Sequence, residues 1–85
     1  MKARVFVTLK PSVFDPQGST IAEALHSLGY AGVSDVRQGK YFELDLDVAS
    51  AQDAEQLASE VASRVLANPV IESFRVELAE AGARR

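Results

Sequence analysis

Cysteine is absent from this chain of 85 residues, and histidine occurs only once. Without cysteine there is no disulfide framework, no thiol nucleophile and no thiolate metal site, and a reducing compartment is compatible with the sequence. The single histidine, His26, lies off the apolar stripe of its helix and has no partner near it in the sequence. Because a general base needs an oriented partner within hydrogen-bond reach, we interpret His26 as an ordinary solvated residue.

An excess of basic residues is also missing. The 9 lysines and arginines are outnumbered by 12 aspartates and glutamates, which gives a net charge of -3. Nucleic-acid-binding domains usually carry a basic patch, and those of the RNA-recognition type add closely spaced exposed aromatic residues in their central strands. The chain has neither feature, so we expect no nucleic-acid partner.

Long hydrophobic runs are absent as well. The N-terminal residues carry charges on both sides of a very short apolar run, which fits neither a signal peptide nor a membrane span. Hydrophobic residues make up 47% of the chain, as is typical of a folded globular unit. We expect a cytoplasmic protein with no membrane partner, built as one domain over residues 1–78 with a tail at 79–85 that frays. A domain of this size has a marginal core and commonly gains stability from oligomerisation.

Alternating apolar residues predict four strands. Their ranges are 3–9, 33–37, 41–48 and 70–78, and a short turn at 38–40 joins the middle two. The run at 41–48 alternates most regularly, so it should lie half-buried in an antiparallel sheet.

Helical spacing of apolar residues predicts two helices. The first starts near the capping-box pair Thr20 and Glu23 and ends at Gly29, and the second lies between Ser50 and Pro69. The order of elements is therefore βαββαβ. It predicts an α+β, ferredoxin-like βαββαβ sandwich with two helices on one face of an antiparallel sheet.

The opposite face of this sheet is expected to mix apolar and charged side chains. Its members are Phe6, Thr8, Tyr41, Glu43, Asp45, Ile71, Ser73 and Arg75. Such a face is more apolar than ordinary surface and too charged to be a core. We expect self-association through this face or through an edge strand.

The loop between the first strand and the first helix, residues 9–18, is unusually stiff and apolar. Pro11 and Pro16 each fix their own φ angle and keep the preceding residue extended. Val13 and Phe14 either fold back onto the core or act as docking groups for another chain. Gly18 indicates a turn that leads into the helix, and the free amides there are an alternative, weaker indication of anion binding.

Groups that could perform chemistry are few. The alternating acids Glu43, Asp45 and Asp47 fit the wet face of a strand better than a cation site, because the other ligands of a metal loop are not evident. Hydroxyl residues occur without a recognisable nucleophile motif. Three cations near the predicted turn could gather an anion, although a solvated turn is the simpler interpretation: Lys10, Arg37 and Lys40. A self-contained enzyme is not expected.

Three stretches together resemble the PurS family, the small subunit of phosphoribosylformylglycinamidine (FGAM) synthase. They are Leu-Lys-Pro-Ser-Val-Phe-Asp-Pro-Gln-Gly at 9–18, Val-Arg-Gln-Gly-Lys-Tyr-Phe-Glu-Leu at 36–44, and Leu-Ala-Asn-Pro-Val-Ile-Glu at 66–72. The resemblance covers nearly the whole chain, in order and at matching spacing. Two positions depart from the family pattern, Ser12, where glycine is usual, and Phe14, where leucine is common.

The resemblance implies a non-catalytic subunit of a complex in purine biosynthesis. In this family's complexes the glutaminase subunit, PurQ, releases ammonia, and the synthetase subunit, PurL, uses ATP to transfer it to formylglycinamide ribonucleotide. The implied partners are PurL, PurQ and further copies of the chain, as a dimer or a tetramer. The implied role is to bridge PurL and PurQ and to assist ammonia transfer. ATP and Mg²⁺ would serve the complex, with no cofactor, metal or catalytic residue in this subunit.

The resemblance also selects site residues, to which we assign a structural or assembly role. These motif positions are Lys10, Asp15, Pro16, Gln17, Gly18, Arg37, Gly39, Lys40, Asn68, Pro69 and Glu72. Our hypothesis for Glu72 is that its carboxylate anchors backbone amides or Arg37.

A small-molecule sensor is the main alternative. Regulatory amino-acid-binding domains share the βαββαβ order, but fold analogy alone supports that assignment. A thermal-shift panel of amino acids and nucleotides would separate the two functions, because a ligand bound only by the native state raises its stability.

Overall fold

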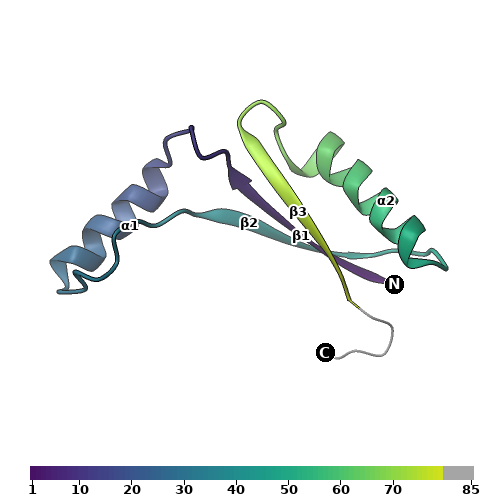
Figure 1. The fold of residues 1–85 in the computed structure, drawn as a ribbon, viewed down its shortest axis with the longest axis horizontal. Coiled ribbons are helices and arrows are strands. Elements are labelled where there is room, and N and C mark those ends of the chain that lie inside the picture. The colour runs from purple at the N-terminus through teal and green to yellow at the C-terminus, as the bar shows by residue number, and fades with distance from the viewer. Residues whose placement is uncertain (80–85) are drawn as a thin grey trace.

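The structure, a computed structural model, describes residues 1–79. Figure 1 shows the elements, which are β1 (Lys2–Leu9), α1 (Pro16–Ser27), β2 (Gly39–Asp45), α2 (Ala51–Val61), the π-helical turn η1 (Ala62–Leu66) and β3 (Glu72–Ala79). The strands form one antiparallel sheet in the order β2-β1-β3. The predicted α+β, ferredoxin-like class is therefore confirmed. Of the tail that was expected to fray, Ala79 is the last residue of β3, and 80–85 lie outside the described residues.

The core lies between the central strand β1 and the helix α2. Inward-facing residues of β1 alternate with outward-facing ones, and Val5 and Val7 are the largest side chains that are completely buried. On the helix side, one stripe consists of small residues, Ala54, Ala58 and Ala62, all completely buried. Small side chains on this stripe let the helix approach the sheet closely, so the core is thin. The helix begins as predicted at Ser50, whose Oγ accepts a hydrogen bond from the Asp53 amide at 3.1 Å.

The predicted strand over residues 33–37 is wrong. Residues 33–38 continue the line of β2 in Figure 1, but they have no regular secondary structure. The physical reason is the length of β1, whose pairing with β2 ends at Thr8 opposite Gly39, so no described strand lies beside 33–38. The predicted turn at 38–40 is wrong for the same reason, since Gly39 and Lys40 are the first residues of β2.

The first helix begins earlier than predicted. Its N-cap is Asp15 and its first residue is Pro16, so Gly18 lies inside the first turn. The predicted capping box at Thr20 is wrong, because the Thr20 hydroxyl instead donates to the Pro16 carbonyl at 3.0 Å. The predicted end is confirmed, since Gly29 follows the helix with a φ of 98°.

The two helices stand in different relations to the sheet. In Figure 1, α2 runs along the sheet, whereas α1 lies beyond its end, beside the segment 33–38. A hydrogen bond of 2.6 Å joins His26 Nε2 to the Val33 carbonyl, which can only accept. Apolar side chains of α1 and its C-cap consequently stay uncovered within the protomer, with Ile21 40% and Leu28 73% exposed.

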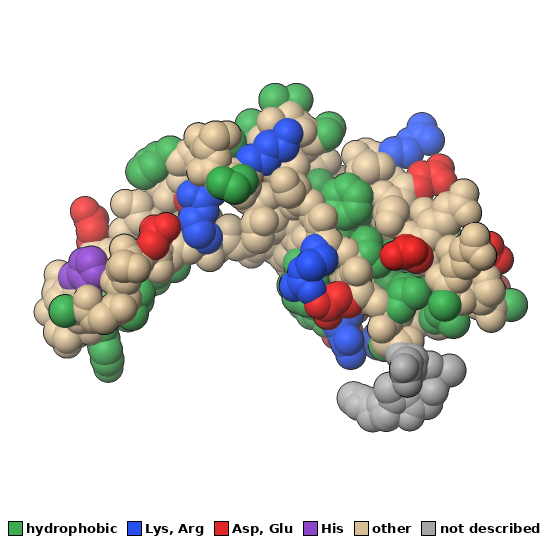
Figure 2. Space-filling model, viewed as in Figure 1, with side chains coloured by type: hydrophobic (Ala, Val, Ile, Leu, Met, Phe, Trp, Pro, Cys, Tyr) green, Lys and Arg blue, Asp and Glu red, His purple; other side chains and the backbone are tan. Residues whose placement is uncertain are grey.

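The resulting protomer is elongated and thin. Its radius of gyration is 16.1 Å and its extents are 49 × 31 × 13 Å, as the curved outline in Figure 2 illustrates. A compact chain of this length has a radius of gyration of about 12 Å. The excess arises because α1 packs on one extended segment instead of on the sheet. No helix within residues 1–79 is both long enough and apolar enough to cross a membrane.

The outer face of the sheet carries an aromatic and charged cluster, as the alternation predicts. The Phe6 and Tyr41 rings lie 5.1 Å apart between centroids, and the Arg75 guanidinium stands 4.3 Å from the Phe6 centroid. The Tyr41 hydroxyl donates to Glu43 at 2.8 Å. This hydrogen bond stabilises the charged carboxylate, so the pKa of Glu43 lies below its ordinary value.

Candidate functional site

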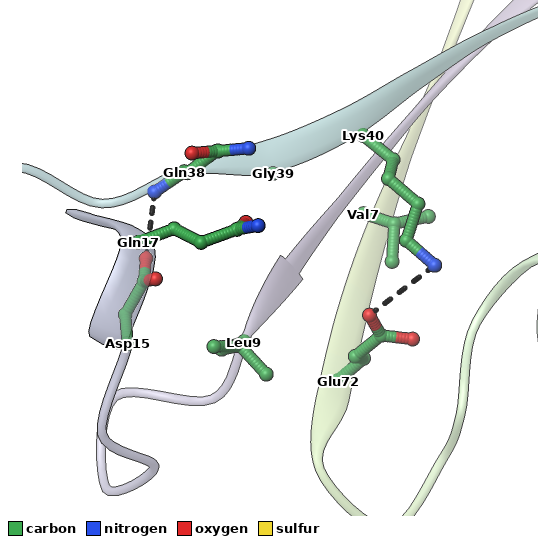
Figure 3. A pocket seen from close by; sticks show the side chains of 8 residues that line it. All are labelled: Val7, Leu9, Asp15, Gln17, Gln38, Gly39, Lys40 and Glu72. Carbon is green, nitrogen blue, oxygen red and sulfur yellow. Dashed lines mark hydrogen bonds and ion pairs between the residues drawn. The ribbon is translucent and has the colours of Figure 1, made fainter.

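The three stretches singled out in the sequence meet at one end of the sheet. We call this region the loop end and define it as residues 9–18, 36–40 and 66–72. The Lys10 amide donates to the Ile71 carbonyl at 2.8 Å, which joins the first stretch to the third. Figure 3 shows the first and second stretches joined through Asp15 and Gln38, and the second and third joined through Lys40 and Glu72. The folded chain therefore brings together every motif position named in the sequence analysis.

Asp15 connects the loop to the segment that leads into β2. Its carboxylate accepts the Gly18 amide at 2.9 Å, which caps α1, and the Gln38 amide at 2.7 Å. Although it is an acid, Asp15 is only 5% exposed. The hydrogen bond from Gln38, followed by the one from Gly18, holds the pKa of Asp15 below its ordinary value, and the charge of Arg37 adds to this effect.

Arg37 organises the same loop from the other side. Its Nη2 atom lies 2.9 Å from the Lys10 carbonyl, 3.1 Å from the Val13 carbonyl and 3.4 Å from the Leu9 carbonyl. Carbonyls at the end of a strand and in a loop otherwise need water or another donor. One guanidinium thus fixes the path of the chain between β1 and α1.

Glu72 holds the turn between η1 and β3. One carboxylate oxygen accepts the Asn68 amide at 2.7 Å, and the other lies 3.5 Å from Lys40 Nζ. The Asn68 side chain in turn accepts the Val70 amide at 3.0 Å. The hypothesis that Glu72 anchors a backbone amide agrees with this contact. The alternative partner, Arg37, is bound to carbonyls instead.

A pocket of about 210 Å³ opens between these groups. Its lining residues, shown in Figure 3, are Val7, Leu9, Asp15, Gln17, Gln38, Gly39, Lys40 and Glu72. The two carboxylates already accept backbone amides. Lys40 and Glu72 also pair with each other, so the pocket contains no nucleophile next to a free base.

Two glycines allow the backbones at the loop end to touch. A Cβ atom on Gly18 would stand 2.1 Å from the Val36 carbonyl oxygen, and one on Gly39 would stand 2.4 Å from the Val7 carbonyl oxygen. Both contacts are far shorter than real Cβ atoms make. Gly18 is therefore a packing residue between α1 and residue 36, and the interpretation of Gly18 as a turn before the helix is wrong.

The apolar pair in the loop has two different environments. Val13 is half-buried, whereas Phe14 is 72% exposed. Folding back onto the core is therefore wrong for Phe14. The exposure of the Phe14 ring could not be predicted from its residue type alone.

The alternative ligand sites suggested by the sequence are not assembled. Arg37 and Lys40 are engaged with carbonyls and with Glu72, respectively, so they do not converge with Lys10 on an anion. Glu43 lies 3.7 Å from Lys2 Nζ, as expected for the solvated face of a strand. No group of three or more histidine, aspartate or glutamate side chains in the described range 1–79 could hold a metal ion.

Comparison with known proteins gives a consistent result. The model of the PurS family, described as phosphoribosylformylglycinamidine (FGAM) synthase, matches residues 2–80. The PurS subunit of FGAM synthase from Bacillus subtilis (strain 168) is 48% identical over 83 residues, covering 98% of both chains. The corresponding subunit from Mycobacterium leprae is 48% identical over 75 residues, covering 88% of this chain and 91% of that protein.

Solved structures resemble this fold closely. Bacillus subtilis PurS in its C2 crystal form has a TM-score of 0.80 and 49% identity, covering 93% of this chain and 98% of that chain. A chain in the structure of PurLQS from Thermotoga maritima has a TM-score of 0.82 and 28% identity, covering 89% of this chain and 93% of that chain.

Proposed function

Because the chain belongs to the PurS family of FGAM synthase subunits, we propose that it bridges the glutaminase and synthetase subunits, PurQ and PurL, and assists ammonia transfer between them. The reaction is the ATP- and glutamine-dependent conversion of formylglycinamide ribonucleotide to formylglycinamidine ribonucleotide. In this proposal the chain supplies no catalytic group and no cofactor site, and ATP and Mg²⁺ serve the complex. The complex would work in the cytoplasm.

The observation that carries this proposal is how the loop end uses its charged residues. Asp15, Arg37 and Glu72 all direct their charges at backbone groups of their own chain. Such contacts fix the loop end in one shape and engage these three charged groups within the chain. A rigid surface without chemistry is what a bridging subunit needs, because ammonia must pass along a path that excludes water. Similarity to a chain of the Thermotoga maritima PurLQS structure supports membership of a complex.

Removing this chain should abolish the glutamine-dependent reaction and spare the ammonia-dependent one. The test mixes purified PurL and PurQ with or without the chain and follows formylglycinamidine ribonucleotide, with either glutamine or ammonium chloride as nitrogen source. Ammonium chloride reaches the synthetase from solution, so it needs no bridge. If both reactions proceed equally well without the chain, the bridging role is wrong.

The second part of the proposal is self-association, in which copies of the chain bind each other as a dimer or a tetramer. Residues 33–38 extend β2, and no strand of the described range 1–79 pairs with them. The exposed apolar side chains Ile21 and Leu28, in α1 and at its C-cap, lie uncovered in the same part of the protomer. A second protomer placed there would extend the sheet and cover Ile21 and Leu28. The radius of gyration of 16.1 Å, well above that of a compact chain, supports the same arrangement.

The double substitution of Ile21 and Leu28 by glutamate should dissociate the oligomer into monomers. Burying two unpaired carboxylates in an interface costs several kcal/mol per charge. Sedimentation velocity gives the mass of each variant. Val65→Glu is the matched control, because Val65 is 75% exposed on η1, away from α1. If the double variant sediments with the mass of the wild-type oligomer, self-association does not use α1. The outer face of the sheet would then be the place of self-association.

A further inference from the structure

The pocket at the loop end has the size of a site for a small metabolite. Its volume of about 210 Å³ corresponds to the space of about seven water molecules. This lies below the roughly 300 to 1,000 Å³ of pockets for drug-sized ligands. Part of the lining is apolar, because Val7 and Leu9 of β1 contribute to it and Val7 is completely buried. Polar side chains from α1, β2 and β3 surround these two residues, as Figure 3 shows, and such a combination is typical of a ligand site.

Lys40 and Glu72 place a cation and an anion side by side in this pocket. Lys40 Nζ lies 3.5 Å from Glu72 Oε2, and the other Glu72 oxygen accepts the Asn68 amide at 2.7 Å. The α-carbon of a free amino acid likewise carries one cation and one anion. When the ligand carboxylate meets Lys40 and the ligand ammonium meets Glu72, the four charges alternate around a ring, so the ion pair need not break. Hydrogen bonds between charged groups of this kind are among the strong ones in proteins.

The charges around the pocket favour such a zwitterion over a simple anion. The charged residues that line it are Asp15, Lys40 and Glu72. Of the other charges nearby, Arg37 is bound to backbone carbonyls, and Lys10 and Asp35 line separate hollows. An anion such as phosphate would therefore meet one lysine beside two carboxylates, which disfavours its binding.

Two side-chain amides are available for the rest of the ligand. Gln17 in α1 and Gln38 before β2 both line the pocket, and neither side-chain amide forms a hydrogen bond within residues 1–79. In Figure 3 the Gln17 side chain points across the pocket toward Lys40 and Glu72. A primary amide has both donors and an acceptor, so it is complementary to another primary amide. A ligand carboxylate would use the donors alone and would add a charge beside Asp15.

We propose that this pocket binds a free α-amino acid with a side-chain amide, of which L-glutamine is the probe. Lys40 binds the α-carboxylate, Glu72 binds the α-ammonium group and Gln17 binds the side-chain amide. The methylene groups of the ligand lie against Val7 and Leu9. Glutamine is also the nitrogen donor in the proposed function, but the site does not rest on that function, because all of its groups belong to this one chain.

The test titrates L-glutamine into the full chain, without other subunits, and measures binding by calorimetry. Wild type should bind with a dissociation constant of about 1 mM or below. Lys40→Met removes the charge at similar length and should weaken binding about tenfold or more, while the fold tolerates the change because the Lys40 side chain is 57% exposed. Lys2→Met is the matched control and should bind as wild type does, because Lys2 also pairs with a carboxylate, Glu43 at 3.7 Å, but on the outer face of the sheet.

Ligand analogues test the contacts one by one. Gln17→Met should weaken the binding of glutamine about fivefold and leave unchanged the binding of L-alanine, which has no side-chain amide. Glutaramate is glutamine without the α-ammonium group, and inorganic phosphate is a simple anion. Both should bind at least about tenfold more weakly than glutamine. Circular dichroism checks that each variant is folded.

The inference is overturned if wild type binds no glutamine at concentrations up to about 20 mM, or if Lys40→Met binds glutamine as tightly as wild type does. Equal binding of phosphate and glutamine would also overturn it, because the pocket would then be a plain anion site. These results leave the bridging role untouched, since that role is tested with PurL and PurQ present and by product formation.

Discussion

Gly18→Ala is expected to lower the melting temperature by roughly 10 °C, although alanine is the better helix former. Helix propensity alone predicts a gain of about 1 kcal/mol inside α1. Against this, the new Cβ atom would stand 2.1 Å from the Val36 carbonyl oxygen and 2.8 Å from Asp15 Oδ2. A clash with backbone cannot be relieved by a rotamer change, so we expect a cost at the upper end of the usual range for overpacking, about 3 kcal/mol. The net loss of about 2 kcal/mol corresponds to this fall in melting temperature for a small domain.

Gly32→Ala is the matched control for this experiment. A Cβ atom on Gly32 meets nothing within 4 Å, and its φ lies outside the left-handed range. Thermal unfolding followed by circular dichroism should show Gly32→Ala melting at or slightly above the wild-type temperature. If Gly18→Ala is instead as stable as Gly32→Ala, α1 does not pack against residue 36 as described.

Asp15→Ala is expected to have a comparable effect, with a pH dependence that identifies its cause. The substitution removes the cap of α1 and the acceptor for the Gln38 amide together. Loss of the cap and of a hydrogen bond to a charged acceptor should lower the melting temperature by roughly 5 to 10 °C at pH 7. Asp15→Asn should fall between the two proteins, because asparagine caps helices well but lacks the charge.

The pH dependence follows from the direction of the pKa shift. The folded-state pKa of Asp15 is lowered, chiefly by the hydrogen bond from Gln38. The stabilisation is therefore complete above the unfolded-state pKa of about 4 and is lost as the pH falls through the lower folded-state pKa. The difference in melting temperature between wild type and Asp15→Asn should be constant from about pH 5 to about pH 7 and should shrink below about pH 4.

Asp35→Asn provides the control for charge removal in the same region. Asp35 is exposed, and its carboxylate accepts the adjacent Val36 amide at 2.9 Å. Its substitution should change the melting temperature by no more than about 2 °C at any pH. Equal pH profiles for Asp35→Asn and Asp15→Asn would contradict the role given to Asp15.

Some patterns that depend on neighbouring residues predict the structure correctly, although the capping box at Thr20 does not. The alternation in β1 placed Val5 and Val7 in the core, and Ser50 marked the start of α2. The start of α1 was also readable, since aspartate followed by proline is a usual N-cap and N1 pair. Gly18 gives a competing local signal, because a glycine at that position also favours a turn.

Features that depend on distant residues could not be predicted. Whether residues 33–38 become a strand depends on how far β1 extends beside them, and alternation in 33–37 does not contain that information. Arg37 reaches the Lys10 carbonyl across 27 positions of the chain, and no local pattern indicates such a contact. The resemblance singled out three separate stretches, and only the folded chain shows that they meet at the loop end.

The small core affects the steady-state abundance of this protein in a cell. Within residues 1–79 the buried apolar residues are five alanines and two valines, so each protomer gains little free energy from its own packing. Every partner that binds only the folded chain then adds to its stability by mass action. Copies made in excess of their partners would spend more time unfolded and therefore accessible to proteases. In such a system, degradation adjusts the abundance of the chain to that of the complex it belongs to.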